Sequence, residues 1–370
     1  MKMLLPDYGM KLLFIGIFTC LTSAACAQLA AAIPYTSEAI AEKDTLHYVD
    51  AESKTSNLTA MMVEDDNQLQ NNLALKISQP HERKLLMGYL QQLELDNNLN
   101  SNQSNSKKLY RLANLFARLK FYPLAMKCFL KSMKIDKNNN PDYDPLKTDS
   151  IGNVSMNSKD DSLVNAQAQL LKSKNSKATN YRRISNTFND GKTAVAYALL
   201  FHVKQPVPGK RKIFVFSNTG HTFITLIKYN SDSTYVSCSF GFYPKKDHIF
   251  SATPAYPSTS AQFKNDVSHQ WDEVVGKFIS KRRFDRILKL TKQYDELEYH
   301  LSSNNCTDFS LQAAAMAGIN IANTIGSWPL GRGNNPAYTG QSIINGTFSN
   351  ANTAQVSGLF SNINTTVKLQ

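Results

Sequence analysis

The stretch from Tyr299 to Gly318, YHLSSNNCTDFSLQAAAMAG, sets one cysteine between a polar run and an apolar run that stops at a glycine. Asn305 is a favoured N-cap residue, Asp308 suits the positive end of a helix, and a glycine suits the position after its end. Cys306 is then the first helical residue, where unpaired backbone N–H groups lower the pKa of a thiol. The stretch therefore predicts a capped helix with a cysteine at its start.

A second stretch, SNTGHTFITLIKYN, places His221 after a glycine and at the start of an apolar run that is typical of a β-strand. Cysteine hydrolases need a thiolate, a base that holds the proton, and N–H donors for an oxyanion. A helix that begins at Cys306 supplies the first and third, and His221 supplies the base if that helix packs on the sheet. The alternative is a buried structural cysteine and an ordinary strand histidine. Both interpretations are open at this point.

The order of these features resembles that of the circularly permuted papain-like cysteine hydrolases. This group includes cell-wall peptidase-like enzymes and lecithin–retinol acyltransferase-like proteins. The resembling residues are GHTFITL (220–226) and NNCTDFS (304–310), and the resemblance covers roughly residues 193–318. It implies an α+β fold in which an antiparallel sheet packs on the cysteine-bearing helix, preceded here by a small all-α region.

The resemblance also implies roles for individual residues. Cys306 matches the nucleophile, His221 the base, and Asn305 the helix cap at the oxyanion site. In the family, a polar residue on the strand after the histidine strand orients the imidazole. Residues 234–244 form that strand here, and Ser239 is our choice because alternation can direct it toward the site. The strand carries no carboxylate, so we expect the imidazole to be held less firmly than in a full triad.

Further acidic and histidine residues lie near these motifs. The structural interpretation of these residues is that Asp266 or Ser268 caps a helix. A metal site built from His248, Asp266 and His269 is conceivable, but the spacings match no standard ligand set, so we predict no metal and no cofactor. Asp308 opposes a thiolate at Cys306 because a carboxylate within one helical turn disfavours negative charge.

Composition limits the classes of protein to which this chain can belong. The chain has 370 residues, of which 42% are hydrophobic, so it can form one large domain or two modest ones. Its formal charge of +12 favours contact with anionic material. The basic residues are scattered, apart from GKRK at 209–212 and KRRF at 281–284. We interpret them as a solvated surface and predict no nucleic-acid site.

The N-terminus has the pattern of a targeting segment. Lys11 precedes the apolar run LLFIGIFTCLTSAA, and small residues fit cleavage after Ala27. The run is too short to be a comfortable membrane span. We therefore predict a signal peptide at 1–27 and export to a periplasmic or extracellular location. A lipoprotein acylated at Cys26 is the alternative, although the preceding residues lack the usual large aliphatic side chain.

Cleavage leaves three cysteines. An odd number in an exported chain leaves at least one thiol unpaired, and three cysteines are too few for a disulfide framework. We expect one of them, Cys128, to be a core thiol.

The first half of the chain predicts helices. Residues 28–66 are polar and read as a flexible leader, and 67–137 read as a helical region. Within it we expect two helices broken at Pro80, then a hairpin at 109–136 with Pro123 in the first turn of its second helix. The hairpin resembles one tetratricopeptide repeat, and an ordinary amphipathic helical pair is the alternative.

The second half predicts a sheet. After a linker at 138–180 with one helix around 163–171, residues 181–344 form the papain-like domain, and 345–370 are an Asn-rich, frayed tail. Turn residues bound the runs, which predicts an antiparallel sheet. The expected strands are 193–204, 212–218, 221–229 and 234–243. The expected helices are 272–279 and 283–290, with a strand or extended segment at 294–301 and loops after Gly318.

These features favour an exported, cysteine-dependent hydrolase or acyltransferase of the bacterial envelope. The expected substrate is an amide or ester in a cell-wall peptide or a lipid, and that step rests on the resemblance and the export signal alone. The helical region offers a surface for a protein partner. The alternative is a catalytically silent binding or scaffold protein.

Overall fold

The computed structural model describes residues 65–95, 102–139, 151, 153–172, 176–216, 218–245, 247–248 and 250–363. The predicted signal peptide (1–27), Cys26 and nearly all of the predicted leader (28–66) lie outside these residues. No helix within the described ranges is long and apolar enough to cross a membrane.

A seven-stranded sheet forms the centre of the fold, and all of its described pairings are antiparallel. This confirms the predicted α+β class and the antiparallel sheet. The strand order is β1-β6-β4-β3-β2-β7-β13. The strands are β1 (Ala178–Thr179), β2 (Ala194–Lys204), β3 (His221–Asn230), β4 (Tyr235–Pro244), β6 (Ala261–Asn265), β7 (Glu273–Ile279) and β13 (Phe360–Ser361).

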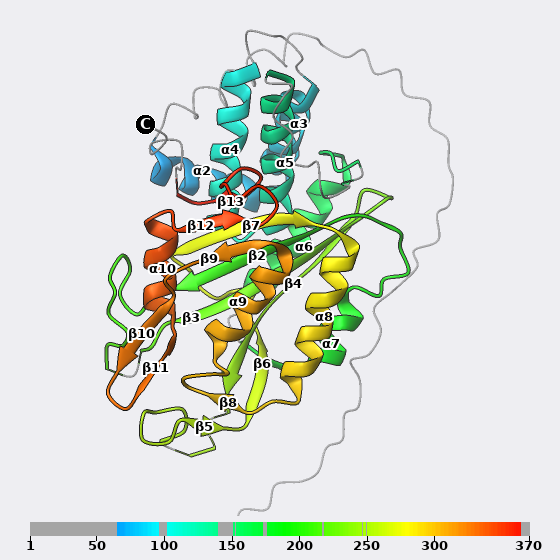
Figure 1. Cartoon of the computed structure of the whole chain (residues 1–370). Coiled ribbons are helices and arrows are strands. Elements are labelled where there is room, and N and C mark those ends of the chain that lie inside the picture. The colour runs from blue at the N-terminus through cyan, green and yellow to red at the C-terminus, as the bar shows by residue number, and fades with distance from the viewer. Residues whose placement is uncertain are drawn as a thin grey trace, which may run out of the picture. The chain divides into compact units, whose positions relative to one another are not determined.

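Both faces of the sheet are covered, which explains why β3 is buried along its whole length. Because side chains alternate along a strand, β2 contributes to two different cores. Ala196, Ala198 and Leu200 pack with the N-terminal helices. Leu199, Phe201 and Val203 pack with the C-terminal helices. Figure 1 shows the two groups of helices on opposite sides of the central strands.

One layer consists of five helices from the first half of the chain. They are α2 (Asp66–Ser78), α3 (Pro80–Leu95), α4 (Asn102–Arg118), α5 (Tyr122–Asn139) and α6 (Lys159–Lys172). The predicted break at Pro80, the hairpin with Pro123 in the first turn of its second helix, and the helix around 163–171 are confirmed. Cys128 is fully buried, as expected for a core thiol.

Buried polar contacts join this layer internally and to the sheet. The Tyr229 hydroxyl donates to the Pro123 carbonyl at 2.7 Å, across the interface between β3 and α5. Lys127 of α5 pairs with Asp160 of α6 at 2.7 Å, with both side chains almost fully buried. Helix α6, which lies in the predicted linker, is thus tied into the helical layer.

The other layer carries the cysteine. Its helices are α7 (Tyr181–Thr187), α8 (Lys281–Asp295), α9 (Cys306–Ala317) and α10 (Pro336–Ile344). Its short strands are β5 (Ser258–Thr259), β8 (Tyr299–His300), β9 (Ile319–Ile321), β10 (Ile325–Trp328), β11 (Gly331–Asn334) and β12 (Phe348–Asn350). Helix α9 packs on β2, β3 and β4. It starts at Cys306 and ends before Gly318, whose φ of 82° is left-handed, as predicted.

Two secondary-structure predictions in the sheet region are wrong. The expected helix at 272–279 is β7, a buried strand between β2 and β13 that is rich in Val, Ile and Phe. The expected strand at 212–218 is a loop with one isolated bridge between Val215 and Asn218. Both edges of β3 are already paired, with β2 and β4, so this apolar segment has no neighbouring strand to join.

The prediction of loops after Gly318 and a frayed tail is also wrong for the described residues. Strands β10 and β11 form a hairpin, and Asn335 caps α10 with Pro336 at its first position. Strand β12 pairs with β9, and β13 pairs with β7 at the sheet edge. Phe360 is fully buried against rings of the helical layer, which anchors the chain near its end.

Candidate active site

A full capping box fixes the start of α9. The Asn305 side chain accepts hydrogen bonds from the backbone N–H groups of Thr307 at 2.7 Å and Asp308 at 3.0 Å. Asp308 in turn accepts from the backbone N–H of Asn305 at 3.0 Å. The predicted N-cap is confirmed, and it places Cys306 in the first turn, where the helix dipole favours a thiolate.

The remaining atoms of this cap hold neighbouring segments. The Asn305 amide donates to the carbonyls of Leu301 at 2.8 Å and Asn334 at 3.0 Å. The Asn334 amide donates to Asp308 at 2.7 Å. Both N–H bonds of the Asn305 amide are therefore used, and Asn305 also accepts from the N–H groups of Thr307 and Asp308, so an oxyanion at this site has to rely on the backbone N–H of Cys306. Burial raises the pKa of Asp308.

Backbone geometry positions His221 at the start of β3. Gly220 has a φ of 74°, and a Cβ at this residue would lie 2.4 Å from the Lys204 carbonyl oxygen. Only glycine fits this turn, and it delivers the imidazole to the end of the sheet where α9 begins. His221 and Cys306 are each 7% exposed. The structure brings these two predicted residues close enough for each to shift the pKa of the other, and the thiol lies 3.9 Å from the hydroxyl of Thr307.

Asp266 orients the imidazole. Its Oδ2 atom lies 3.1 Å from Nε2 of His221, and the carboxylate is fully buried. The Tyr243 hydroxyl donates to Oδ1 at 2.6 Å, and its ring lies 4.2 Å from the imidazole. Nδ1 of His221 remains for the thiol. Together these contacts form a buried relay that runs Cys306–His221–Asp266–Tyr243.

Ser239, our predicted orienting residue, lies elsewhere in the hydrogen-bond network. Its hydroxyl is 2.8 Å from that of Thr225, which is 2.9 Å from the ring of His202. Ser239 is nevertheless next to the orienting group, because its carbonyl accepts from the backbone N–H of Asp266 at 2.9 Å. The imidazole is thus held by a carboxylate on the next strand of the sheet rather than by the serine of β4.

The expectation that Asp266 caps a helix is wrong, because the residues that follow it are turn and β7. Asp266 directly follows β6, whose pairing with β4 brings it to the site. Sequence reasoning searched only the strand after the histidine strand. The available signal was an aspartate that directly follows the alternating run AQFKN.

Gly241 was also missed. A Cβ at this position would lie 2.5 Å from Nε2 of His221 and 2.6 Å from Oδ2 of Asp266. Side chains of one face alternate along β4, so Gly241 leaves the space that the imidazole–carboxylate pair occupies. The glycine between two phenylalanines in SFGFY was the sequence signal for such a close approach.

The electrostatics of the relay favour an ion pair. Burial lowers the pKa of His221, but the charge of Asp266, its hydrogen bond and the neighbouring Cys306 outweigh burial and raise the pKa to about 9. Burial raises the pKa of Cys306, but the hydrogen bond and charge of His221 outweigh it, so the thiol pKa falls below its ordinary value. Both shifts favour a thiolate beside an imidazolium over the neutral pair.

Tyr299 closes the site from the side of β8. Tyr299 is buried beside Cys306: burial is the main cause that raises its pKa, and the neighbouring Cys306 raises it further. The backbone N–H of Cys306 is the donor that an oxyanion would use. A substrate that reaches the thiol from this side therefore has to displace the Tyr299 side chain.

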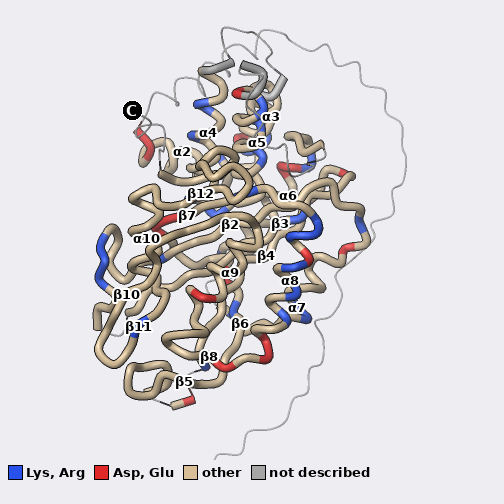
Figure 2. The backbone as a smooth tube through the Cα atoms, in the orientation of Figure 1, with Lys and Arg blue, Asp and Glu red and all other residues tan. Residues whose placement is uncertain are grey.

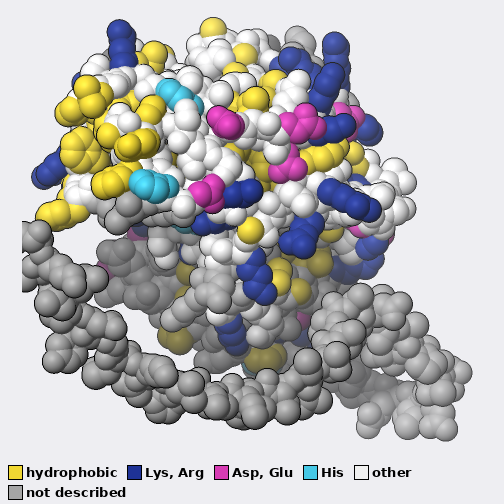
Figure 3. Space-filling view, turned by 90° about the horizontal axis from the view of Figure 1, so that it is seen from below, with side chains coloured by type: hydrophobic (Ala, Val, Ile, Leu, Met, Phe, Trp, Pro, Cys, Tyr) yellow, Lys and Arg dark blue, Asp and Glu magenta, His cyan; other side chains and the backbone are white. Residues whose placement is uncertain are grey.

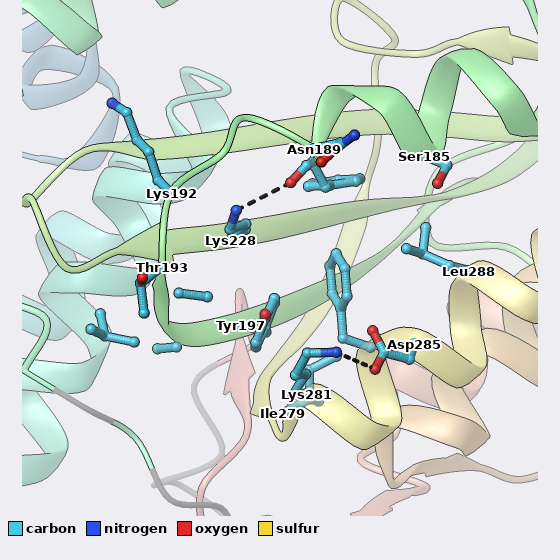
Figure 4. Close-up of a pocket in the computed structure, with 15 residues that line it drawn as sticks. Ser185, Asn189, Lys192, Thr193, Tyr197, Lys228, Ile279, Lys281, Asp285 and Leu288 are labelled. Carbon is cyan, nitrogen blue, oxygen red and sulfur yellow. Dashed lines mark hydrogen bonds and ion pairs between the residues drawn. The ribbon is translucent and has the colours of Figure 1, made fainter.

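Metal and pocket geometry add nothing to this site. Among the described residues, no three His, Cys, Asp or Glu side chains converge in a way that could hold a metal ion. A hollow of about 610 Å³ lies at the ends of β2 and β3 that are far from His221 (Figure 4). Lysines line it, and each is paired with a carboxylate. The pairs are Lys192–Asp232, Lys228–Asp190 and Lys281–Asp285.

Comparisons with protein families, with curated proteins and with solved structures found no match to this chain. The chemistry of the site therefore rests on the residues and their geometry.

Proposed function

We propose that the protein is a cysteine-dependent hydrolase or acyltransferase that acts on an amide or ester. The observation that carries the proposal is the buried relay, in which His221 lies 3.1 Å from Asp266 and is coupled to Cys306 through the pKa shifts that each causes in the other. Nucleophile, base and orienting group in this order are the parts that acyl transfer through a thiol requires.

The reaction follows from the ion pair. The Cys306 thiolate attacks the acyl carbon, and the carbonyl oxygen takes up negative charge against the backbone N–H of Cys306. The His221 imidazolium then gives its proton to the departing amine or alcohol, which leaves a thioester on Cys306. A water or another acceptor attacks the thioester while His221 takes its proton, and the thiolate is released.

Asp266 and Tyr243 act through His221. The carboxylate holds the imidazole in one orientation and stabilises its positive charge, and Tyr243 holds the carboxylate. A full set of orienting groups supports an active enzyme better than the serine that the sequence suggested.

The proposed fold is the permuted papain-like arrangement. Its support is the chain order, in which the histidine strand β3 precedes the further strands and the cysteine helix α9. We further propose export, with a cell-wall peptide or a lipid ester as substrate. The tetratricopeptide-like pair α4 and α5 is proposed as a partner-binding element, and α2 and α6 pack beside it.

A substrate screen tests the activity. The protein and its Cys306→Ala variant are incubated with muropeptides and with esters of short and long acyl chains, and products are identified by mass spectrometry. The proposal predicts a product that the variant does not form and a protein mass raised by one acyl group when the reaction is stopped early. Identical product profiles for both proteins contradict it.

One observation favours the silent binding protein as a second candidate. Tyr299 is buried beside Cys306, and both residues are less than a tenth exposed, so the site is almost closed. A Tyr299→Phe variant separates the candidates. An enzyme that opens gains or keeps thiol reactivity when this hydroxyl is removed, whereas a silent site shows no substrate turnover in either form.

A further inference from the structure

Exposed apolar side chains gather in three loops. Of the nine large hydrophobic residues that are exposed in the described part of the chain, six lie in the loop 205–220, the loop 245–257 and the β10–β11 hairpin. We name these six residues the apolar rim: Phe214, Phe216, Phe250, Tyr256, Ile325 and Leu330. Figure 3 shows hydrophobic side chains collected on one side of this end of the molecule.

Two of the loops meet at one aromatic ring. The Arg211 guanidinium lies 5.7 Å from the centre of the Tyr338 ring. A Cβ at Gly326 in β10 would lie 2.7 Å from an atom of the same ring. The loop that carries Phe214 and Phe216 therefore lies beside the hairpin that carries Ile325 and Leu330.

All three loops adjoin the candidate site. The loop 205–220 ends at His221. The loop 245–257 ends where the Pro257 carbonyl accepts from the backbone N–H of Leu301 at 2.9 Å. The hairpin ends at Asn334, whose carbonyl accepts from the cap residue Asn305 at 3.0 Å. The apolar rim thus lies at the same end of the sheet as His221 and Cys306.

At the tips of two of these loops, an exposed apolar residue has a left-handed backbone conformation. Phe216 is 98% exposed with a φ of 53°, and Leu330 is 85% exposed with a φ of 67°. Left-handed backbone favours glycine or asparagine and is disfavoured for bulky residues. Bulky apolar side chains at both tips contribute nothing to the core, so their placement is explained by something outside the chain that covers them.

Positive charge accompanies the apolar rim. The three loops contain six Lys or Arg residues and one acidic residue, Asp247. Lys210, Arg211 and Lys212 are exposed within four residues of Phe214, and Arg332 is exposed beside Leu330. Figure 2 shows basic residues along the loop beside β10. Aromatic and aliphatic tips mixed with basic residues match the boundary between anionic headgroups and acyl chains.

We propose that the apolar rim docks the protein on an anionic lipid bilayer. Phe216 and Leu330 enter the boundary between headgroups and acyl chains, and the basic residues of the same loops contact the headgroups. Docking places the approach to Cys306 at the bilayer surface. The docking depends on the apolar rim alone, so it is tested independently of the chemistry proposed for Cys306.

Binding to lipid vesicles tests the docking. The purified protein is sedimented with vesicles of phosphatidylglycerol mixed with phosphatidylcholine, and with vesicles of phosphatidylcholine alone. We expect binding to the anionic vesicles and a partition coefficient lowered roughly tenfold or more by the double change Phe216→Ser and Leu330→Ser, because each side chain loses its apolar burial. The control, Leu75→Ser with Leu170→Ser, removes two other exposed hydrophobic residues (60% and 58% exposed) from α2 and α6 and leaves binding unchanged.

Two further variants test the contribution of basic residues to vesicle binding and its independence from catalysis. Lys210→Gln with Lys212→Gln lowers binding to anionic vesicles roughly tenfold and leaves the weak binding to neutral vesicles unchanged. Cys306→Ala binds vesicles like the parent protein, so docking and catalysis fail independently. The proposal is overturned if the parent protein does not sediment with anionic vesicles, or if the Phe216 and Leu330 changes leave binding intact. It is also overturned if those changes abolish only the capture of a partner protein.

Discussion

Asp266 and His221 lie 3.1 Å apart at the same end of the sheet, although they belong to segments separated by 45 residues and by the intervening strand β4. The carboxylate is fully buried and takes a second hydrogen bond from Tyr243. Because a buried charge needs partners, this arrangement stabilises a protonated imidazole, which in turn stabilises the Cys306 thiolate.

Replacing Asp266 with asparagine keeps the shape of the side chain and removes its charge. The pKa of His221 is then expected to fall from about 9, so the Cys306 thiolate loses its partner charge near neutral pH. We expect the alkylation rate of Cys306 near pH 7 to fall roughly tenfold, which corresponds to one pKa unit. Rates are measured with iodoacetamide and peptide mass spectrometry.

The control for this change is Asp285→Asn, which removes an exposed carboxylate that pairs with Lys281 on α8. It is expected to leave the reactivity of Cys306 unchanged. Equal rates in the parent and Asp266→Asn would show that the carboxylate does not tune the site.

The pKa of His221 also predicts how stability depends on pH. The folded protein holds the imidazole proton more tightly than the unfolded chain, because the pKa rises from 6.5 to about 9 on folding. The resulting stabilisation is fully present below the ordinary pKa and is lost as pH rises through the folded value. Its upper limit is on the order of 3 kcal/mol.

Urea unfolding checks this at pH values below 6.5 and above 9. The difference in unfolding free energy between the parent protein and His221→Gln should shrink as pH rises across this window. A difference that stays constant contradicts the raised pKa.

We expect Gly241→Ala to displace His221 or Asp266 from the candidate active site. Its Cβ would meet Nε2 of His221 at 2.5 Å and Oδ2 of Asp266 at 2.6 Å, so one of the two must leave its position. We expect loss of most Cys306 reactivity while circular dichroism stays close to that of the parent. The matched control is Gly88→Ala in α3, where a Cβ meets nothing within 4 Å and a gain of about 0.5–1 kcal/mol is expected. Full reactivity in Gly241→Ala contradicts the described geometry.

Phe360→Ala tests whether the C-terminal segment is part of the fold. The ring is fully buried, stacks near Tyr110 and Phe129, and closes the sheet edge beside β7. Its removal is expected to lower the free energy of unfolding by about 3–5 kcal/mol. Chemical denaturation measures the change, with the exposed Leu75→Ala as control. If the tail were frayed, the free energy of unfolding would fall by less than about 1 kcal/mol.

Local signals of the chain were readable from sequence. Asn305, Asp308 and Gly318 set the bounds of α9 through contacts within a few residues, and Pro80 and Pro123 fixed helix starts in the same way. The apolar runs at 221–229 and 234–243 correctly gave neighbouring antiparallel strands, because short turn-rich connections join them.

Features that depend on pairing between distant segments could not be predicted from the sequence. The run at 212–218 has strand composition and forms a loop, whereas 273–279 forms the strand beside β2, and only the completed sheet decides which segment finds a partner. Asp266 reaches the imidazole through the pairing of β6 with β4, and Phe360 is buried through the pairing of β13 with β7. The burial of Phe360 has no local signature in the sequence, and the aspartate that directly follows the run AQFKN marks a strand end without naming its partner.

The reactivity of the three described cysteines toward iodoacetamide near neutral pH is the most direct measure of the central claim. Cys128 is fully buried, and burial raises the pKa of Cys238 to about 12, so both serve as internal controls. The relay predicts that Cys306 is labelled faster than a free cysteine, and that His221→Ala removes this advantage. Labelling of Cys306 at or below the rate of a free cysteine, with no change in His221→Ala, contradicts the account.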